Sequence, residues 1–572
     1  MRRVGATLGR VLRRHAHFVG PGIMSSVAFM DPGNWATDLS AGAQFGYRLL
    51  FVLLLAALIG ILLQVLAVRM GVVSGVDLAR GTRLLLLPEE RSARLTQAPR
   101  RRWYKTRLAA LWLLYFVAEG AIIATELAEL VGSAIALNLL FPALPLWAGV
   151  LLTSVDCLLI LLVYSEGRSM RVFEAIIALL VFVVMACFGV LLARVDADWG
   201  DVFHGYLPSS TVVQSEALYI GVGILGATVM PHALFNASSW ATVNRLEYDA
   251  EPPRQNEASA APSPASHWWL VRRFGSLRRS MHRRFESLPS MRLGGPRIPS
   301  PDAKAAAPAP SVASIKIHLA HATADIVLSL LCFALVVNSA ILIVAAASFY
   351  FAPQRQQVGD LFDAFELIKR TVGHSSAILF AVALLAAGQS ASLTVTLAGQ
   401  LVSEGFIHWT TNPFWRRVLT RAIALLPSFT IAAAVGRGGL DRMLVASQVA
   451  LSMALPFVLV PLLVITSSKT WMTVREARNV GEAEAAAEQA GIKADEPATP
   501  AAVKPETPGT PGAVLLPYVA SPPPLPPADA EAQERVGRFA SPWPVVLLCW
   551  LIYALIVLCD GFVVVTSAMG KS

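Results

Sequence analysis

Charged residues are scarce in this chain. Asp, Glu, Lys and Arg make up 15% of its 572 residues, whereas an ordinary soluble domain carries about 25%. Hydrophobic residues make up 55%, and apolar runs of about 20 residues, long enough to cross a bilayer, recur along the chain. We therefore predict an all-α polytopic membrane protein that spans the lipid bilayer many times.

Cysteine is also sparse, and no CxxC spacing occurs. All five cysteines lie within apolar stretches, which favours small buried apolar residues over disulfides or metal ligands: Cys157, Cys187, Cys332, Cys549 and Cys559. The sequence contains no recognisable nucleophile–base set and no phosphate-binding loop, so we predict neither an enzyme nor a bound cofactor.

The net charge of +9 does not predict a nucleic-acid partner. The Arg residues cluster between apolar runs, where positive charge sets the orientation of a membrane protein. Residues 1–17 are basic, and no small-residue cleavage site follows them. We interpret this segment as a retained, cytoplasmic N-terminus rather than a signal peptide.

Windows of spanning length predict about eleven spans: 18–41, 47–72, 108–140, 146–164, 171–194, 217–240, 320–349, 375–400, 418–436, 443–466 and 542–566. Arg-rich loops follow the even-numbered spans, and Asp-containing loops follow the fifth and seventh. This alternation satisfies the positive-inside rule with a cytoplasmic N-terminus.

These spans divide the chain into membrane parts and linkers. The first membrane part is 18–240, with a cytoplasmic loop at 80–107, and the second is 319–467. A final helix covers 542–567. Two cytoplasmic segments, 241–318 (basic) and 468–541, are rich in Pro and Ala and cannot bury enough apolar surface to fold, so we predict that they are disordered.

Two apolar stretches are interrupted by polar residues and proline: Asp31-Pro32-Gly33-Asn34 and Met230-Pro231-His232. An Asp at the membrane centre costs about 2.5–3.5 kcal/mol, and proline removes backbone hydrogen bonds from a helix. The first five spans and the next five each open with such a break. This layout predicts an inverted repeat of five plus five helices, with the binding site between the two breaks and the last helix outside the repeat.

The residues at the breaks offer one anionic oxygen, two neutral oxygens and one sulfur: Asp31, Asn34, the Ala227 carbonyl and Met230. Mg²⁺ and Ca²⁺ prefer shells made only of oxygen, whereas a thioether is better tolerated by softer transition metals. We therefore predict Mn²⁺ or Fe²⁺ as substrate, with Cd²⁺ also accepted. The alternative is that Met230 merely fills a gap in the core.

The third span carries Glu119, Glu126 and Glu129, whose spacing allows them to share one helix face. Carboxylates within a membrane are usually part of an ion or proton path, and a structural ion-pair network is the alternative. His232, beside the second break, titrates nearest neutral pH and is a candidate proton relay. Its alternative role is a hydrogen bond at the broken helix.

At these residues the chain resembles the Nramp (natural resistance-associated macrophage protein) family of proton-coupled divalent metal transporters. The similarity covers the first ten spans and is carried by three stretches: Gly20 to Tyr47 with its Asp31-Pro32-Gly33-Asn34, Gly226 to His232, and Gly388 to Phe406. The resemblance implies a LeuT-like fold and metal coordination by Asp31, Asn34, the Ala227 carbonyl and Met230. It also implies that Gln448 joins the metal in occluded states and that Arg421 pairs with the third-span acids.

The chain departs from the family pattern at two positions. Glu126 stands where the family usually has Asp, and Ala237 stands where a second histidine is common. Gln448 also has an alternative role as an interhelical hydrogen bonder.

We expect a proton-coupled importer of divalent metal ions in a eukaryotic plasma, endosomal or vacuolar membrane. The rival hypotheses are the same fold carrying Mg²⁺ or an organic solute, and a non-transporting metal sensor or signalling protein. The sequence does not predict an oligomeric state.

Overall fold

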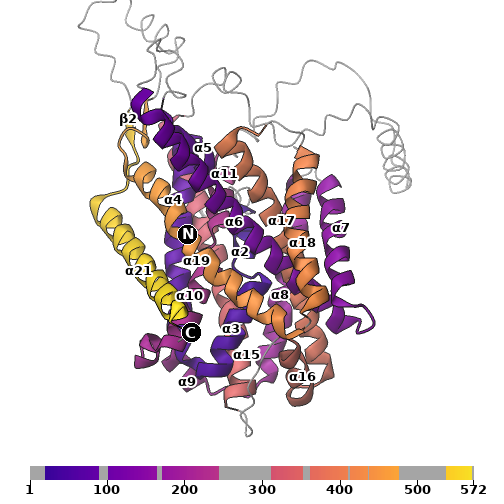
Figure 1. The fold of residues 1–572 in the computed structure, drawn as a ribbon. Coiled ribbons are helices and arrows are strands. Elements are labelled where there is room, and N and C mark those ends of the chain that lie inside the picture. Colours follow the sequence, from indigo (N-terminus) through magenta and orange to yellow (C-terminus); the bar gives the residue numbers. More distant parts are fainter. Residues whose placement is uncertain are drawn as a thin grey trace, which may run out of the picture.

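A computed structural model describes residues 20–88, 101–163, 170–243, 311–351, 361–409, 413–435, 437–475 and 536–569. Several predicted segments therefore lie partly or wholly outside the described residues: the N-terminus 1–17, residues 89–100 of the loop 80–107, and most of the linkers 241–318 and 468–541. The described part is a bundle of helices that run up and down through one body (Figure 1).

The long continuous helices among the described residues lie side by side in the bundle (Figure 1): α4 (Leu50–Ser74), α6 (Arg101–Leu140), α7 (Leu146–Val163), α8 (Met170–Arg194), α17 (His374–Ile407), α18 (Pro413–Ala434), α19 (Arg437–Ser467) and α21 (Trp543–Ala568). Shorter elements connect them: η1 (Gly46–Leu49), α5 (Leu78–Leu86), α9 (Trp199–Gly205), η3 (Ser210–Val213) and α16 (Leu361–Thr371).

Three further helical stretches are irregular. The first is divided into α2 (Pro21–Val27) and α3 (Pro32–Phe45), and the second into α10 (Ser215–Thr228) and α11 (Pro231–Trp240). The third runs through α14 (Val312–Ser329), η6 (Leu330–Leu335), α15 (Val336–Ala345) and η7 (Ala346–Tyr350), where η6 and η7 are π-helical turns. Such turns often occur at functional sites.

The eleven predicted spans each coincide with a helix or a broken helix. Within the described residues, eight helical stretches are long and apolar enough to cross a membrane, and one of them, Pro32–Ser74, includes parts of two predicted spans. The all-α membrane architecture agrees with the sequence analysis, and the total of about eleven spans remains a prediction.

Large apolar side chains also cover the outside of the bundle. Phe116, Leu179 and Leu558 are each more than 60% exposed. Their helices, α6, α8 and α21, all have windows of spanning hydropathy. A water-soluble protein rarely exposes so much apolar surface, which suits a protein surrounded by lipid.

Two short strands lie at the ends of the predicted linker 468–541. β1 (Thr473–Arg475) pairs antiparallel with β2 (Val536–Arg538), with Val474 opposite Gly537. The buried Phe539 donates its backbone N–H to the Met472 carbonyl at 2.8 Å. The two ends of this segment are therefore ordered against α19 and α21.

Candidate metal centre

The first break is built by the sequence Asp31-Pro32-Gly33-Asn34. Asp31 is the N-cap of α3: its Oδ1 accepts the Asn34 N–H at 2.9 Å, and its Oδ2 accepts the Gly33 N–H at 3.3 Å. Pro32 takes the first helical position, where a missing N–H costs nothing. The motif therefore starts a helix inside the bundle and places a carboxylate at its positive end.

Side chains satisfy the backbone carbonyls released between α2 and α3. The Phe29 carbonyl accepts a hydrogen bond from Asn338 Nδ2 of α15 at 2.7 Å, and the Met30 carbonyl accepts one from Trp35 Nε1 at 3.1 Å. Because unpaired buried carbonyls are costly, these contacts stabilise the unwound segment.

The second break meets the first. α10 ends at Thr228, and α11 begins at Pro231 with Met230 as its N-cap. The Ala227 carbonyl accepts a hydrogen bond from Asn34 Nδ2 at 2.8 Å, and the same nitrogen lies 2.5 Å from Asp31 Oδ1. The structure thus brings Asp31, Asn34 and Ala227 together from two distant parts of the chain.

Gln448 of α19 joins this group. Its Nε2 lies 3.5 Å from Asp31 Oδ2, and both side chains are buried. Four N–H groups therefore surround the carboxylate of Asp31. The oxygens Asn34 Oδ1 and Gln448 Oε1 have no hydrogen-bond partner among the described residues. A half-turn of either amide about its last side-chain bond would present an oxygen, instead of a nitrogen, to a cation beside Asp31.

Met230 is buried in the same apolar cluster as Ala28 and Phe29 of the first break. This placement fits a sulfur ligand between the breaks and also fits a core-filling role. Among the described residues, no group of three or more His, Cys, Asp and Glu side chains could hold a metal. The donor set here instead consists of one carboxylate, amides, a carbonyl and a thioether.

His232 lies in the first turn of α11 and is 1% exposed. Neither of its ring nitrogens has a hydrogen-bond partner among the described residues, and no side chain caps the start of this helix. No contact among the described residues therefore supports the alternative role of His232, a hydrogen bond at the broken helix.

The predicted pairing of Arg421 with the third-span acids appears in the geometry. Glu126 Oε1 lies 3.7 Å from Arg421 Nη1, and both side chains are 1% exposed. Glu129 is buried on the same helix and Glu119 is half-buried. The movement of protons through these acids remains a prediction.

Two hydroxyl groups that were not predicted from the sequence join this network. Thr396 Oγ1 donates to Glu126 Oε1 at 3.3 Å, and Arg421 Nη2 donates to Ser392 Oγ at 2.5 Å. Ser392 and Thr396 are one turn apart on α17, and polar residues at this spacing in an apolar helix are the signal that could have identified them.

Asp38 is a further buried carboxylate that was not among the predicted site residues. It is fully buried in α3, one turn after Asn34, and neither carboxylate oxygen has a hydrogen-bond partner among the described residues. The rule that carboxylates within a membrane default to functional sites would have included it.

Known proteins are similar to this chain over most of its length. The family model described as natural resistance-associated macrophage protein-like (Nramp) matches residues 22–86, 92–261 and 303–485. The chain is 41% identical to the manganese transporter pdt1 of Schizosaccharomyces pombe, over 81% of this chain and 77% of that protein. It is 37% identical to the iron transporter SMF3 of Saccharomyces cerevisiae, over 83% of this chain and 87% of that protein.

Solved structures are similar too. The crystal structure of a mutant of the manganese transporter of Eremococcus coleocola superposes with a TM-score of 0.59. The two proteins are 28% identical, and the match covers 81% of each chain.

Proposed function

The chain belongs to the Nramp family of metal transporters, and we propose that it imports Mn²⁺ or Fe²⁺ into the cytoplasm together with protons. Its fold is the LeuT-like helix bundle of this family, it is an integral multi-pass membrane protein, and it is not an enzyme. Its substrates are divalent metal ions, among which we include Cd²⁺.

One observation carries the proposal: the Asn34 side chain links the Asp31 carboxylate to the Ala227 carbonyl. A single cation beside these groups would have an anionic oxygen and a carbonyl oxygen within reach. Gln448 and Asn34 would each add an amide oxygen after rotation, and Met230 a thioether. The thioether supports a transition metal over Mg²⁺ and Ca²⁺.

Proton coupling follows from the chemistry of the ligands. A bound cation favours the ionised carboxylate of Asp31, so metal binding and proton release are linked. His232 and the acids Glu119, Glu126 and Glu129 supply further titratable groups along α11 and α6. Alternating exposure of the site would then carry both ions inward across a plasma, endosomal or vacuolar membrane.

The test is uptake by the purified full chain in liposomes. Mn²⁺, Fe²⁺ and Cd²⁺ should enter, Mg²⁺ and Ca²⁺ should be excluded, and an inwardly directed proton gradient should accelerate entry. Uptake that does not respond to the gradient would contradict proton coupling. An absence of uptake for every metal would favour a sensor or signalling protein, and preferred Mg²⁺ uptake would favour the rival substrate.

A further inference from the structure

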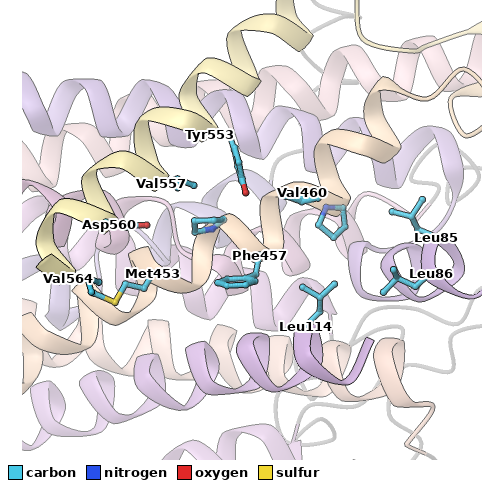
Figure 2. A pocket seen from close by; sticks show the side chains of 13 residues that line it. Leu85, Leu86, Leu114, Met453, Phe457, Val460, Tyr553, Val557, Asp560 and Val564 are labelled. Carbon is cyan, nitrogen blue, oxygen red and sulfur yellow. The ribbon is translucent and has the colours of Figure 1, made fainter. Parts of the chain in front are cut away.

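A pocket of about 530 Å³ lies between α19 and α21, on the side of α19 that faces the last helix. Its volume falls within the range of about 300–1,000 Å³ that is usual for small-molecule sites. Figure 2 shows residues at helical spacing along its two long walls: Tyr553, Val557, Asp560 and Val564 from α21, and Met453, Phe457 and Val460 from α19. Leu114 of α6 and two leucines of α5 close one end.

Asp560 is the charged residue among the described residues that line this pocket. It is 6% exposed, and its Oδ1 accepts a hydrogen bond from Ser452 Oγ at 2.6 Å. Its Oδ2 is buried and has no hydrogen-bond partner among the described residues. A buried polar atom without a hydrogen-bond partner is costly. We therefore infer that a ligand of the pocket supplies a hydrogen-bond partner to this oxygen.

The surroundings of the pocket indicate where such a ligand comes from. Apart from the Tyr553 hydroxyl and Asp560, the lining side chains are apolar. On the outer face of α21, Leu555 and Leu558 are 43% and 71% exposed, and the helix has the length and hydropathy of a membrane span. A ligand therefore reaches the pocket from the hydrocarbon layer rather than from water.

The carboxyl group of Asp560 also restricts which polar group the ligand can carry. A hydroxyl both donates and accepts hydrogen bonds, so it satisfies Oδ2 of Asp560 whether the carboxyl group is ionised or protonated. An ammonium group would require an ionised carboxylate and would bring a second charge into the hydrocarbon layer. We propose that this pocket binds a hydroxyl-bearing amphipathic lipid, with its hydroxyl on Asp560 and its apolar body between Phe457 and Val557.

Such a lipid would contact the transport machinery. Ser452, the hydrogen-bond partner of Asp560, lies one helical turn after Gln448 on α19. An occupant of the pocket would therefore lie against the helix that contributes a candidate metal ligand.

The experiment uses the full chain in phosphatidylcholine vesicles with a trace of a photoreactive cholesterol. We expect crosslinks on residues 453–461 and 553–564, competed by excess cholesterol and not by cholestane, which has the same ring system without oxygen. Equal competition by cholestane would overturn the proposal, as would crosslinks spread evenly over the outer helices, because both outcomes describe lipids that merely surround the protein.

Two substitutions sharpen the test. Gly561 lines the pocket, and no atom lies within 4 Å of the position that a Cβ would take there. Gly561→Leu should therefore place an apolar side chain in the pocket and lower crosslinking about tenfold, while Gly189→Leu, at an equally open position on α8, should not. Tyr553→Phe removes the other hydroxyl of the pocket and should leave the competition by cholesterol in place.

Asp560→Ala should weaken competition by cholesterol about tenfold through loss of the hydrogen bond. Chromatography and thermal unfolding identify any variant that fails to fold. If that variant is Asp560→Ala, which also loses the contact with Ser452, then Gly561→Leu decides the matter, because it keeps that contact. Unchanged crosslinking in Gly561→Leu would overturn the proposal. None of these readouts depends on metal uptake.

Discussion

Asn34 and Ala227 are 193 positions apart, and the Nδ2 group of the first donates a hydrogen bond to the carbonyl oxygen of the second at 2.8 Å. The Ala227 carbonyl lies at the end of α10 and is free to accept because Pro231, four residues later, has no N–H to donate. Asn34 lies in the first turn of α3. The first break thus supplies the donor that the second break lacks, while Asn338 and Trp35 satisfy the carbonyls of the first break.

Asp31→Asn should abolish Mn²⁺ uptake and leave the fold intact. Asn is as good an N-cap as Asp: its single amide oxygen can keep the shorter hydrogen bond from the Asn34 N–H, while the longer bond from the Gly33 N–H and the negative charge are lost. We expect uptake in liposomes to fall at least about tenfold, since a charged ligand is worth more than about 1.4 kcal/mol.

The matched control for this variant is Asp198→Asn, at the exposed N-cap of α9. It makes the same chemical change outside the membrane-spanning helices and should not alter uptake. Wild-type uptake by Asp31→Asn would show that capping alone explains this aspartate.

Met230→Ala should keep Mn²⁺ transport and admit Ca²⁺. Without the thioether, the remaining ligands are all oxygen, which suits the harder ion. The measurement is the inhibition of Mn²⁺ uptake by increasing Ca²⁺. Met70→Ala, another buried methionine of the same apolar cluster, controls for the cavity left behind. If both variants discriminate as well as the wild type, Met230 is a packing residue.

Glu126 and Arg421 should behave as a coupled pair. Removal of one partner of a buried ion pair costs about 3–5 kcal/mol, so Arg421→Met and Glu126→Gln should each lower thermal stability. The double variant should be more stable than the sum of the two losses predicts. Additive losses would mean that the 3.7 Å contact contributes little.

The same pair tests proton movement. If Glu126 carries protons, Glu126→Gln should lose the acceleration of uptake by a proton gradient and still exchange Mn²⁺ without one. Acceleration that persists in this variant would assign Glu126 a structural role. Thermal unfolding of the same sample separates this effect from a loss of folded protein.

The two breaks were predictable because their residues conflict with the local environment. A carboxylate and Pro-Gly in an apolar run are costly, and the signal lies within four adjacent positions of the chain. Asn338 is different: it satisfies the Phe29 carbonyl at 2.7 Å, but nothing near either residue encodes that contact. The relative position of two helices depends on packing over their whole length, which sequence spacing does not provide.

The residues of the proposed site also differ in how far the sequence predicted them. Asp31, Asn34 and Met230 could be predicted from the residue types at the two breaks. Gln448 was predicted only from family resemblance, because a glutamine in an apolar helix has many possible partners. Ser392 and Thr396 could have been selected from their one-turn spacing on α17, but that spacing does not identify their partner. Their importance rests on Arg421, which approaches them from another helix.

Gly33→Ala offers a test of Gln448 that leaves Gln448 in place. A Cβ at position 33 would overlap the side-chain amide of Gln448 and lie 3.0 Å from Asp31 Oδ2. The amide is the far end of a flexible side chain and can move away. Alanine also favours the helix over glycine by about 1 kcal/mol. The variant should therefore fold, lose the contact between Gln448 and Asp31, and raise the KM for Mn²⁺ about tenfold if that amide joins the ion.

Gln448→Leu should raise the KM for Mn²⁺ to a similar extent, and the double variant should add little, because both changes remove the same group. Gly120→Ala, at a position on α6 with no atom within 4 Å of the new Cβ, is the control and should leave the KM unchanged. Independent, multiplying effects in the double variant would mean that the change at Gly33 acts through Asp31 or the backbone of α3 instead. A KM that does not change in either single variant would make Gln448 a hydrogen-bonding residue between helices and remove it from the metal site.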